Sequence, residues 1–330
     1  MMRIVVHIIL ILFCVKLSFA QDPQFSQPYA NPMYLNPALT GDTKMNRVAF
    51  TYRKQWAAYN KGFTTYAASF DHYQENMNSG FGGYLLYDES GANGLKVTNF
   101  NLTYSYDARI DKWSGFRGGI GLGYSFMNYN QNDFLFADQV VRNGAATSLE
   151  NNLVNETAYF DMSAGVLYYN RFLWAGASVS HLNSPNVSLN NQIERLPMKI
   201  SLHTGVKLWT RRNQWGHDLS SLNLIAHYKA QGDFQQMDLG VYYNFRPVVF
   251  GVWYRGIPLK AYNTDYINHE SIILLLGLEY KDQFRIAYSY DITVSELTIH
   301  TGGSHEISLV YEWAGKKKPN RLRNVSCPRF

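Results

Sequence analysis

The sequence predicts a transmembrane antiparallel β-barrel of about fourteen strands. Three observations support this fold: an N-terminal export signal, a composition rich in aromatic residues and glycine, and short segments of alternating apolar and polar residues. The 330-residue chain contains 25 Tyr, 19 Phe, 7 Trp and 25 Gly. Transmembrane barrels combine such a composition with weak segmental hydrophobicity, because only every second side chain faces lipid. A secreted β-sandwich would share part of this signature, so the alternation carries more weight.

Residues 1–20 have the pattern of a cleavable signal peptide. Arg3 precedes an apolar run, and the small residues Ser18 and Ala20 occupy the −3 and −1 positions of a signal-peptidase site. We therefore expect the mature chain to begin at Gln21.

The charge, cysteines and apolar runs of the mature chain exclude several classes of protein. Removal of the signal leaves 28 of the 30 Lys and Arg residues against 25 Asp and Glu residues, which does not favour a nucleic-acid partner. Cys14 lies within the apolar run of the signal, so lipidation is not expected. Cys327 then remains alone, which excludes an intramolecular disulfide. No later apolar run approaches the roughly 18 residues of a transmembrane helix.

Alternation of apolar and polar residues marks the predicted strands. In 285–293, 100–107 and 306–313 the two kinds of residue occupy opposite faces, which is typical of strands between lipid and a lumen. The inward face of 120–126 carries glycines, which would let a plug approach closely. The predicted strands are 46–54, 64–73, 80–88, 97–108, 115–128, 158–169, 171–182, 197–208, 220–229, 235–245, 248–255, 271–280, 283–294 and 304–313.

Connection lengths orient the predicted barrel, because periplasmic turns of such barrels are short and external loops are long. Tight turns after even-numbered strands are expected at 169–171, 244–247 and 280–283, and long loops after odd-numbered strands at 130–157, 183–196 and 256–270. The connection 209–219 is an exception, because it is long where a short turn is expected. An even number of strands places both termini in the periplasm.

The predicted organisation has four parts: a signal peptide at 1–20, an N-terminal periplasmic or plug-like segment at 21–45, the barrel at 46–313 and a basic tail at 314–330. The second part carries four prolines and lacks alternation, so it is either an ordered plug or a flexible lead. The basic tail is expected to be solubilising or membrane-proximal, or to dock a periplasmic partner.

Several blocks of the mature chain resemble a known family. They are QDPQFSQ at 21–27, YLNPALTG at 34–41, RKQW at 53–56, SFD at 69–71, AYSYDI at 287–292, HEISL at 305–309 and CPRF at 327–330. Their residues and order resemble the PorP/SprF family of type IX secretion system membrane proteins.

The resemblance implies a non-catalytic barrel in the outer membrane of a Gram-negative bacterium that serves type IX secretion. Some members associate with the periplasmic ring of the system, and others support export or surface anchoring of a large adhesin needed for gliding motility. The CPRF ending favours the second, SprF-like role. The implied partners are therefore a secreted cell-surface adhesin or periplasmic secretion-ring proteins, in addition to outer-membrane lipid.

No motif of catalysis or of cofactor binding is found in the sequence. The nine histidines have no metal-ligand spacing, and no G-x-S-x-G elbow, P-loop or C-x-x-C occurs. The glycine run 118–123 lacks the strand-then-helix context of a nucleotide site. We therefore expect no enzyme, no cofactor and no metal, although a Ser/His pair assembled only in space stays open.

Two sets of residues are candidates for function. Tyr29, Tyr34, Asn36 and Trp56 are candidate partner-binding residues, because the N-terminal segment and the loops could offer backbone edges and aromatic rings to an incoming strand. The candidate lumen network consists of Asp71, Asp107, Asp291, Arg53 and Arg285 on inward faces. Such charges are expected to pair with one another, since an unpaired buried charge is costly. Gripping an inserted peptide is the alternative.

Three functions fit these predictions. The favoured one is a secretion-associated anchor that binds another protein. The alternative is an outer-membrane channel for small or hydrophobic solutes. A hydrophobic-solute channel would predict an apolar lumen, whereas the inward positions are predicted to be polar. A purely structural barrel, capped by the 130–157 loop, is the third.

Overall fold

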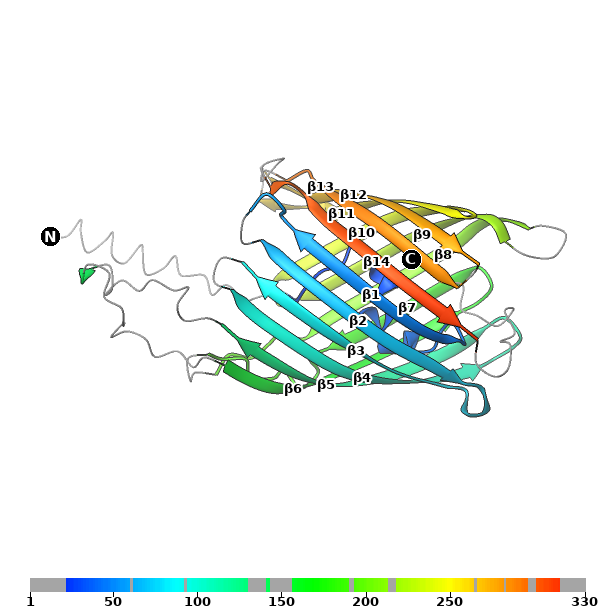
Figure 1. Ribbon diagram of the computed structural model, residues 1–330, viewed down its shortest axis with the longest axis horizontal. Helices are drawn as coiled ribbons and strands as arrows, with labels where there is room; N and C mark the ends of the chain where they lie inside the picture. The colour runs from blue at the N-terminus through cyan, green and yellow to red at the C-terminus, as the bar shows by residue number, and fades with distance from the viewer. Residues whose placement is uncertain are drawn as a thin grey trace.

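The computed structural model describes residues 22–59, 62–91, 94–129, 141–142, 156–189, 193–212, 218–263, 266–281, 283–295 and 301–314. The expected signal peptide, nearly all of the basic tail and most of the 130–157 loop lie outside these residues. Fourteen antiparallel strands form one closed barrel, in which each strand pairs with its sequence neighbours and β1 pairs with β14 (Figure 1). The predicted fold class and strand number are confirmed.

The strands follow one another around the barrel in sequence order. They are β1 (Asn46–Gln55), β2 (Phe63–Gln74), β3 (Ser79–Ser90), β4 (Leu95–Arg109), β5 (Gly115–Asn128), β6 (Glu156–Tyr169), β7 (Leu173–Ser180), β8 (Lys199–Arg212), β9 (Asp218–Gln231), β10 (Phe234–Phe245), β11 (Val248–Asn263), β12 (Tyr266–Tyr280), β13 (Phe284–Thr293) and β14 (Ser304–Trp313).

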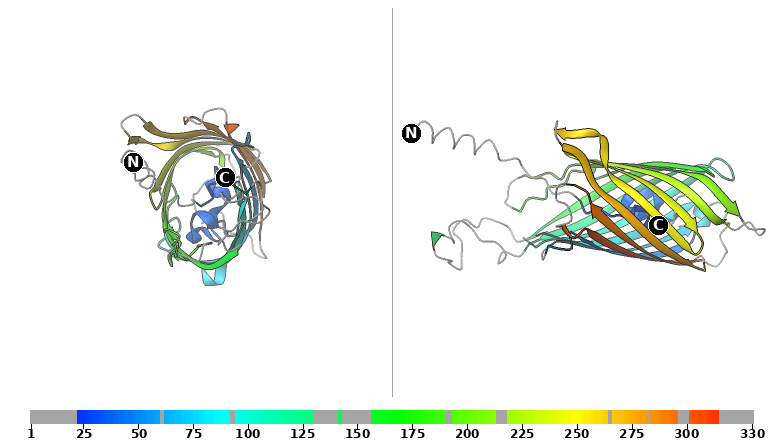
Figure 2. Two further views of the ribbon diagram at one scale, coloured as in Figure 1. Left: turned by 90° about the vertical axis from the view of Figure 1, so that its left-hand side faces the viewer. Right: turned by 90° about the horizontal axis from the view of Figure 1, so that it is seen from above.

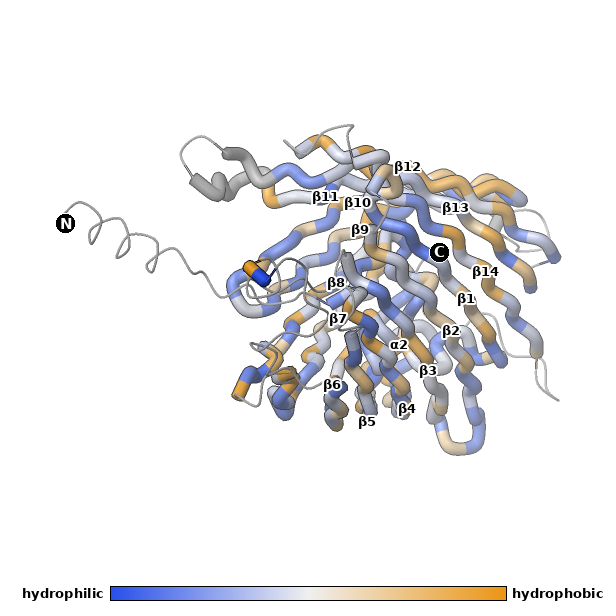
Figure 3. Tube along the Cα trace, turned by 60° about the vertical axis from the view of Figure 1, so that its left-hand side comes forward, coloured by the Kyte–Doolittle hydropathy of each residue, from blue (hydrophilic) through white to orange (hydrophobic). Residues whose placement is uncertain are grey.

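Alternate side chains of each strand face the outside and the lumen. On β5, Phe116, Ile120 and Tyr124 are exposed on the outer surface, whereas Arg117 and Ser125 are buried inside. Figure 3 shows the resulting alternation of hydrophobic and hydrophilic residues along the strands. An apolar outer face with polar residues turned inward is the arrangement of a barrel that spans a membrane.

Two predicted connections were wrong. The long loop expected at 256–270 is mostly strand, because β11 and β12 continue past a register shift at Arg255/Gly256 as far as Asn263 and Tyr266. The exception expected at 209–219 is smaller than predicted, because β8 extends to Arg212 and β9 begins at Asp218. In both places the strands continue through irregular pairing, which a strict period of two does not detect.

The segment from Asp22 to Met45, here called the plug, lies inside the barrel. Three short helical turns form it: η1 (Pro28–Ala30), α2 (Pro32–Leu35) and η2 (Pro37–Leu39). Each begins with proline, whose fixed φ suits the first helical position. Viewed along the barrel, these turns occupy the lumen (Figure 2). Of the two alternatives for the N-terminal segment, the structure thus has the ordered plug. No helix among the described residues is long and apolar enough to span a membrane.

The plug crosses the lumen from one end of the barrel to the other. Asp22 contacts Lys199 at the start of β8, beside the β7–β8 connection. Lys44 contacts Asp107 near the end of β4, beside the β4–β5 turn. These connections follow odd- and even-numbered strands, respectively, so they lie at opposite ends, which we call the loop end and the turn end.

The two ends of the described chain therefore lie at opposite ends of the barrel. Trp313 pairs with Asn46 at the turn end, whereas Asp22 lies at the loop end. The expectation that both termini share the periplasmic side does not fit this arrangement. An even number of strands returns the barrel to its starting end, but it does not account for a preceding segment that crosses the lumen once.

Candidate functional site

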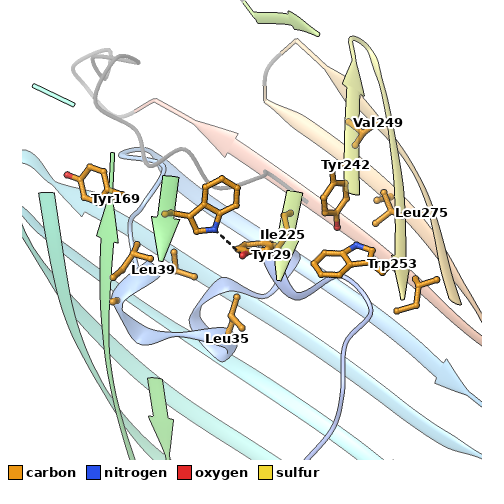
Figure 4. Close-up of a cluster of buried hydrophobic side chains, with 14 residues drawn as sticks. Tyr29, Leu35, Leu39, Tyr169, Ile225, Tyr242, Val249, Trp253 and Leu275 are labelled. Atoms are coloured by element: carbon orange, nitrogen blue, oxygen red, sulfur yellow. Dashed lines mark hydrogen bonds between the residues drawn. The ribbon is translucent and has the colours of Figure 1, made fainter. Parts of the chain in front are cut away.

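The plug packs on an apolar patch inside the barrel. Tyr29, Leu35 and Leu39 of the plug belong to one buried cluster with inward side chains that include Trp174 of β7 and Trp253 of β11. Figure 4 shows plug and wall residues of this cluster facing each other across the lumen. The wall is thus more apolar than the predicted polar lumen. Burial of these side chains stabilises the seated plug through the hydrophobic effect.

Tyr29 also carries a directional contact with the wall. Its hydroxyl accepts a hydrogen bond from Trp174 Nε1 at 3.0 Å, and its ring meets those of Trp174 and His203 edge to face. Buried indole N–H groups need such an acceptor. Tyr29 therefore fixes η1 to one position on the wall.

A charge cluster at the β1–β14 seam grips the plug backbone. Arg53 contacts Asp291 at 2.9 Å and Glu306 at 3.2 Å. The Glu306 carboxylate accepts the backbone N–H groups of Ser26 and Gln27 at 2.6 and 3.0 Å, and the Ser26 hydroxyl donates to Asp291. Because every member is almost fully buried, the pairing offsets a desolvation cost that each charge would otherwise carry.

The same cluster continues along the barrel wall to β11 and β10. Arg255 of β11 contacts Asp291 at 3.2 Å and Asp238 of β10 at 3.1 Å, and it donates to the Phe25 carbonyl at 3.1 Å. Arg53 and Arg255 thus share Asp291, and Arg255 also binds the plug backbone. The cluster joins β1, β10, β11, β13 and β14 through the plug.

A second cluster holds the C-terminal part of the plug. Arg47 of β1 forms two parallel hydrogen bonds with Asp71 of β2, at 2.8 and 2.9 Å, and an ion pair with Asp42 of the plug at 2.7 Å. Asp71 also accepts the Gly41 N–H at 2.6 Å. Bidentate arginine–carboxylate pairs give strong directional contacts. This geometry fixes where the plug turns into β1.

Lys44 completes the plug at the turn end. Its ammonium lies 3.1 Å from Asp107, which also accepts the Tyr169 hydroxyl at 2.7 Å. Burial lowers the pKa of Lys44 to about 8, although the Asp107 carboxylate opposes this shift. The Asp107 carboxylate therefore stabilises the charged form of Lys44.

Asn36 occupies a close approach between plug and wall. Its amide donates to the carbonyls of Val166 and Ala177 at 3.1 and 3.3 Å and lies 3.1 Å from His203 Nε2. A Cβ at Gly165 would lie 2.0 Å from Asn36 Oδ1, so only glycine admits the amide there. Inward glycines thus form a track for the plug.

The first plug residue forms a latch at the loop end. Asp22 pairs with Lys199 and with His181 Nε2, the latter at 2.9 Å, while His181 Nδ1 lies 3.0 Å from Asp161. Burial alone would lower the pKa of His181, but Asp22 and Asp161 outweigh it and raise the pKa to about 9. Burial would likewise raise the pKa of Asp22, but Lys199 and His181 hold it well below its usual value.

The predicted lumen residues all lie on inward faces and are buried, but they form several clusters instead of one. Arg53 and Asp291 belong to the seam cluster, Asp71 to the second cluster and Asp107 to the Lys44 contact. Arg285 pairs with Glu312. The sequence left two roles open for these charges, which were pairing with one another and gripping an inserted peptide. In the structure the charges pair with one another, and they also bind a peptide segment, which is the chain's own plug.

The predicted partner-binding residues lie mostly inside the barrel. Tyr29 and Asn36 are buried, and Tyr34 is partly buried, with its ring against Phe25 and its hydroxyl donating to the Pro23 carbonyl at 2.7 Å. Trp56 lies at the loop end after β1, partly buried. The first three are committed to contacts within the chain, and Trp56 alone is placed where a partner could reach it.

Several of the residues that hold the plug were not identified in the sequence analysis. Glu306 and Glu312 were noted only as polar positions, and Arg117, which donates to the Ala38 carbonyl at 2.9 Å, and Arg255 were not singled out. Alternation could have placed all four inside. Asp22 gave no signal, because its partners depend on the path of the plug.

The arrangement is built for holding a polypeptide. Its buried polar groups are directed at peptide N–H groups, carbonyls and side chains of the plug. Among the described residues, no group of three or more His, Cys, Asp or Glu side chains is placed to hold a metal ion.

Comparison with known proteins agrees with the blocks noted in the sequence. The sequence model described as "Type IX secretion system membrane protein PorP/SprF" matches residues 17–311. The chain belongs to the PorP/SprF family. Comparison of this family member with curated proteins gave no significant match.

Solved structures with a similar fold are outer-membrane barrels. The CymD monoaromatic hydrocarbon channel has a TM-score of 0.51 and 12% identity, over 87% of this chain and 94% of that one. The Pseudomonas putida toluene transporter TodX has a TM-score of 0.48 and 10% identity, over 89% and 94% of the two chains. Omp33 of Acinetobacter baumannii has a TM-score of 0.45 and 5% identity, over 83% and 100%. At 12% identity, the comparison of this PorP/SprF protein with CymD shows a similar fold alone.

Proposed function

We propose that this PorP/SprF-family barrel is a binding component of type IX secretion that holds a secreted cell-surface adhesin at the outer membrane. The observation that carries the proposal is the plug. The plug crosses the lumen and is held by buried ion pairs, which suits a rigid binding platform better than a conduit. The surfaces available for binding a partner are therefore the two ends of the barrel.

The loop end is the end at which we expect the adhesin. The longest connections between strands, β5–β6 and β7–β8, span 129–155 and 181–198, and the strands that they join end at the loop end. Long loops are external in outer-membrane barrels. Trp56 follows β1 at the same end, packed edge to face on Phe63 at 5.2 Å. A partly buried tryptophan held by its neighbours is a typical anchor in protein interfaces.

The solute-channel alternative loses support from the filled lumen. The apolar wall patch that could have contacted a hydrophobic solute is covered by Tyr29, Leu35 and Leu39 of the plug. Transport would require the plug to leave, and departure would expose the buried charges of both clusters.

The test is a mild-detergent pull-down of the tagged protein from its own outer membrane, with mass spectrometry of the recovered proteins. Trp56→Ala is compared with Trp113→Ala, because Trp113 is exposed at the turn end. We expect one large surface protein with the wild type and with Trp113→Ala, and less of it with Trp56→Ala. Recovery of periplasmic ring proteins alone would replace the adhesin role with a ring role, and recovery of neither would overturn the proposal.

A further inference from the structure

A cavity of about 250 Å³ opens at the loop end between the plug and strands β8 to β10. Pro23 and Phe25 of the plug form one side, Lys229 and Gln236 the other, and Phe234 the rim. Asp233 in the short β9–β10 connection and Phe234 at the start of β10 are exposed, so the cavity can be reached from outside. The lining combines apolar surface with a few polar groups, as ligand sites do.

Several polar groups around this cavity are paired within the chain. Lys199 is paired with Asp22 and lies 4.3 Å from the Tyr34 ring centroid. Gln231 donates to Asp22 at 3.1 Å, and His227 lies 2.8 Å from the Ser201 hydroxyl. The contacts of these side chains within the chain hold the plug and the strands in place around the cavity.

Lys229 differs from these groups. Within the described part of the chain, its ammonium forms no hydrogen bond and has no carboxylate within 4.0 Å; Asp238 and Glu270 act on it only over a longer distance. Asp238 is already shared by Arg255 at 3.1 Å and Gln236 at 2.8 Å. An unpaired cation in a partly apolar cavity carries a desolvation cost. An anion that enters the cavity offsets this cost, since the lysine ammonium can donate up to three hydrogen bonds to it.

The surrounding acids limit which anion fits. Asp233 at the rim and Glu270 on the wall would repel a second negative group. Among the described lining residues, Lys229 is the one cation without a carboxylate partner to receive the first. The apolar faces of Pro23, Phe25 and Phe234 suit a hydrocarbon group attached to that anion. The chemistry therefore favours one carboxylate on an apolar body over phosphate or a polyanion.

We propose that this cavity binds a single carboxylate carried on an apolar group, with Lys229 as the cationic contact. Such a group ends a polypeptide whose last residue is apolar, and it also occurs in free organic acids. The polypeptide source rests on the proposed function, since the cavity opens at the end where we place the secreted partner.

The test measures binding to the purified full-length barrel in detergent by calorimetry. The probes are an acetylated tripeptide ending in leucine with a free carboxylate, the same tripeptide as its carboxamide, and hydrocinnamate as a free organic acid. We expect the carboxylate tripeptide to bind about tenfold or more tightly than the amide, as a charge-assisted hydrogen bond implies. Lys229→Met should remove that preference and Lys229→Arg should keep it. Lys112→Met, in the exposed β4–β5 turn, is the matched control and should change nothing.

Equal binding of acid and amide, no binding of either acid, or an unchanged preference in a folded Lys229→Met protein would each overturn the inference. Tighter binding of the tripeptide assigns the site to a polypeptide, and tighter binding of hydrocinnamate assigns it to a free acid. Probe binding needs no adhesin, so it separates the two proposals. Adhesin recovery without a carboxylate preference would overturn this inference alone, and the reverse would overturn the proposed function alone.

Discussion

The carboxylate of Glu306 accepts the backbone N–H of Ser26 at 2.6 Å, although 280 residues separate them. Glu306 lies on the last strand, directly opposite Arg53 of the first strand, with which it pairs. One side chain therefore ties the closing seam of the barrel to the plug. Seating of the plug and closure of the barrel are coupled through this contact.

Replacement of Glu306 tests this coupling. In Glu306→Ala the plug loses two N–H acceptors and Arg53 loses one of its two carboxylates inside the barrel, so the free energy of unfolding should fall by about 3–5 kcal/mol. Urea unfolding in detergent, followed by tryptophan fluorescence, measures this. The neighbouring outward substitution Ile307→Val should cost less than about 1.5 kcal/mol. Equal effects of the two changes would contradict the coupling.

Two adjacent glycines of β5 test the close approach of the plug. A Cβ at Gly119 would lie 2.3 Å from the backbone nitrogen of Ala38, whereas a Cβ at Gly118 meets nothing within 4 Å. Gly119→Ala should displace the plug and make its backbone sensitive to protease, while Gly118→Ala should leave it protected. Protection of the plug in both variants would show that it does not pack on β5 as described.

The Asp22–His181 latch should depend on pH. Since the pKa of His181 is raised to about 9, its contribution is fully present below about pH 6.5, the usual histidine value, and is lost as pH rises through about 9. Hydrogen exchange of residues 22–25 should therefore accelerate between pH 7 and pH 10 beyond the intrinsic increase. His181→Gln should abolish that extra acceleration. The same extra acceleration in the variant would assign it to another group.

The outward face should tolerate apolar substitution but not charge. Phe50 lies mid-strand on the outer face of β1, with 54% of its surface exposed. Phe50→Arg should destabilise the barrel in lipid vesicles by about 2–4 kcal/mol, as a charge near the bilayer midplane does. Phe50→Leu is the control and should cost much less. A similar stability of the two variants would argue against membrane contact at this position.

The fold was predictable from the sequence because strand alternation is a local property. Arg53, Asp71, Asp107, Asp291 and Arg285 were placed inside by parity alone, and all five are buried there. Their pairing was not predictable, because it depends on which strands curve toward each other and on where the plug runs. Asn36 shows this limit, since its partners lie on β6, β7 and β8 and are set only by the path of a segment without periodicity.

The plug is central to this account, and conductance in planar bilayers tests it most directly. The full-length protein should show no steady pore current, whereas a variant lacking residues 22–44 should conduct steadily, because the same wall would then enclose an open lumen. Gly119→Ala should give intermediate or fluctuating currents. A full-length protein that conducts as well as the deletion variant would contradict a plugged binding platform and favour a solute channel.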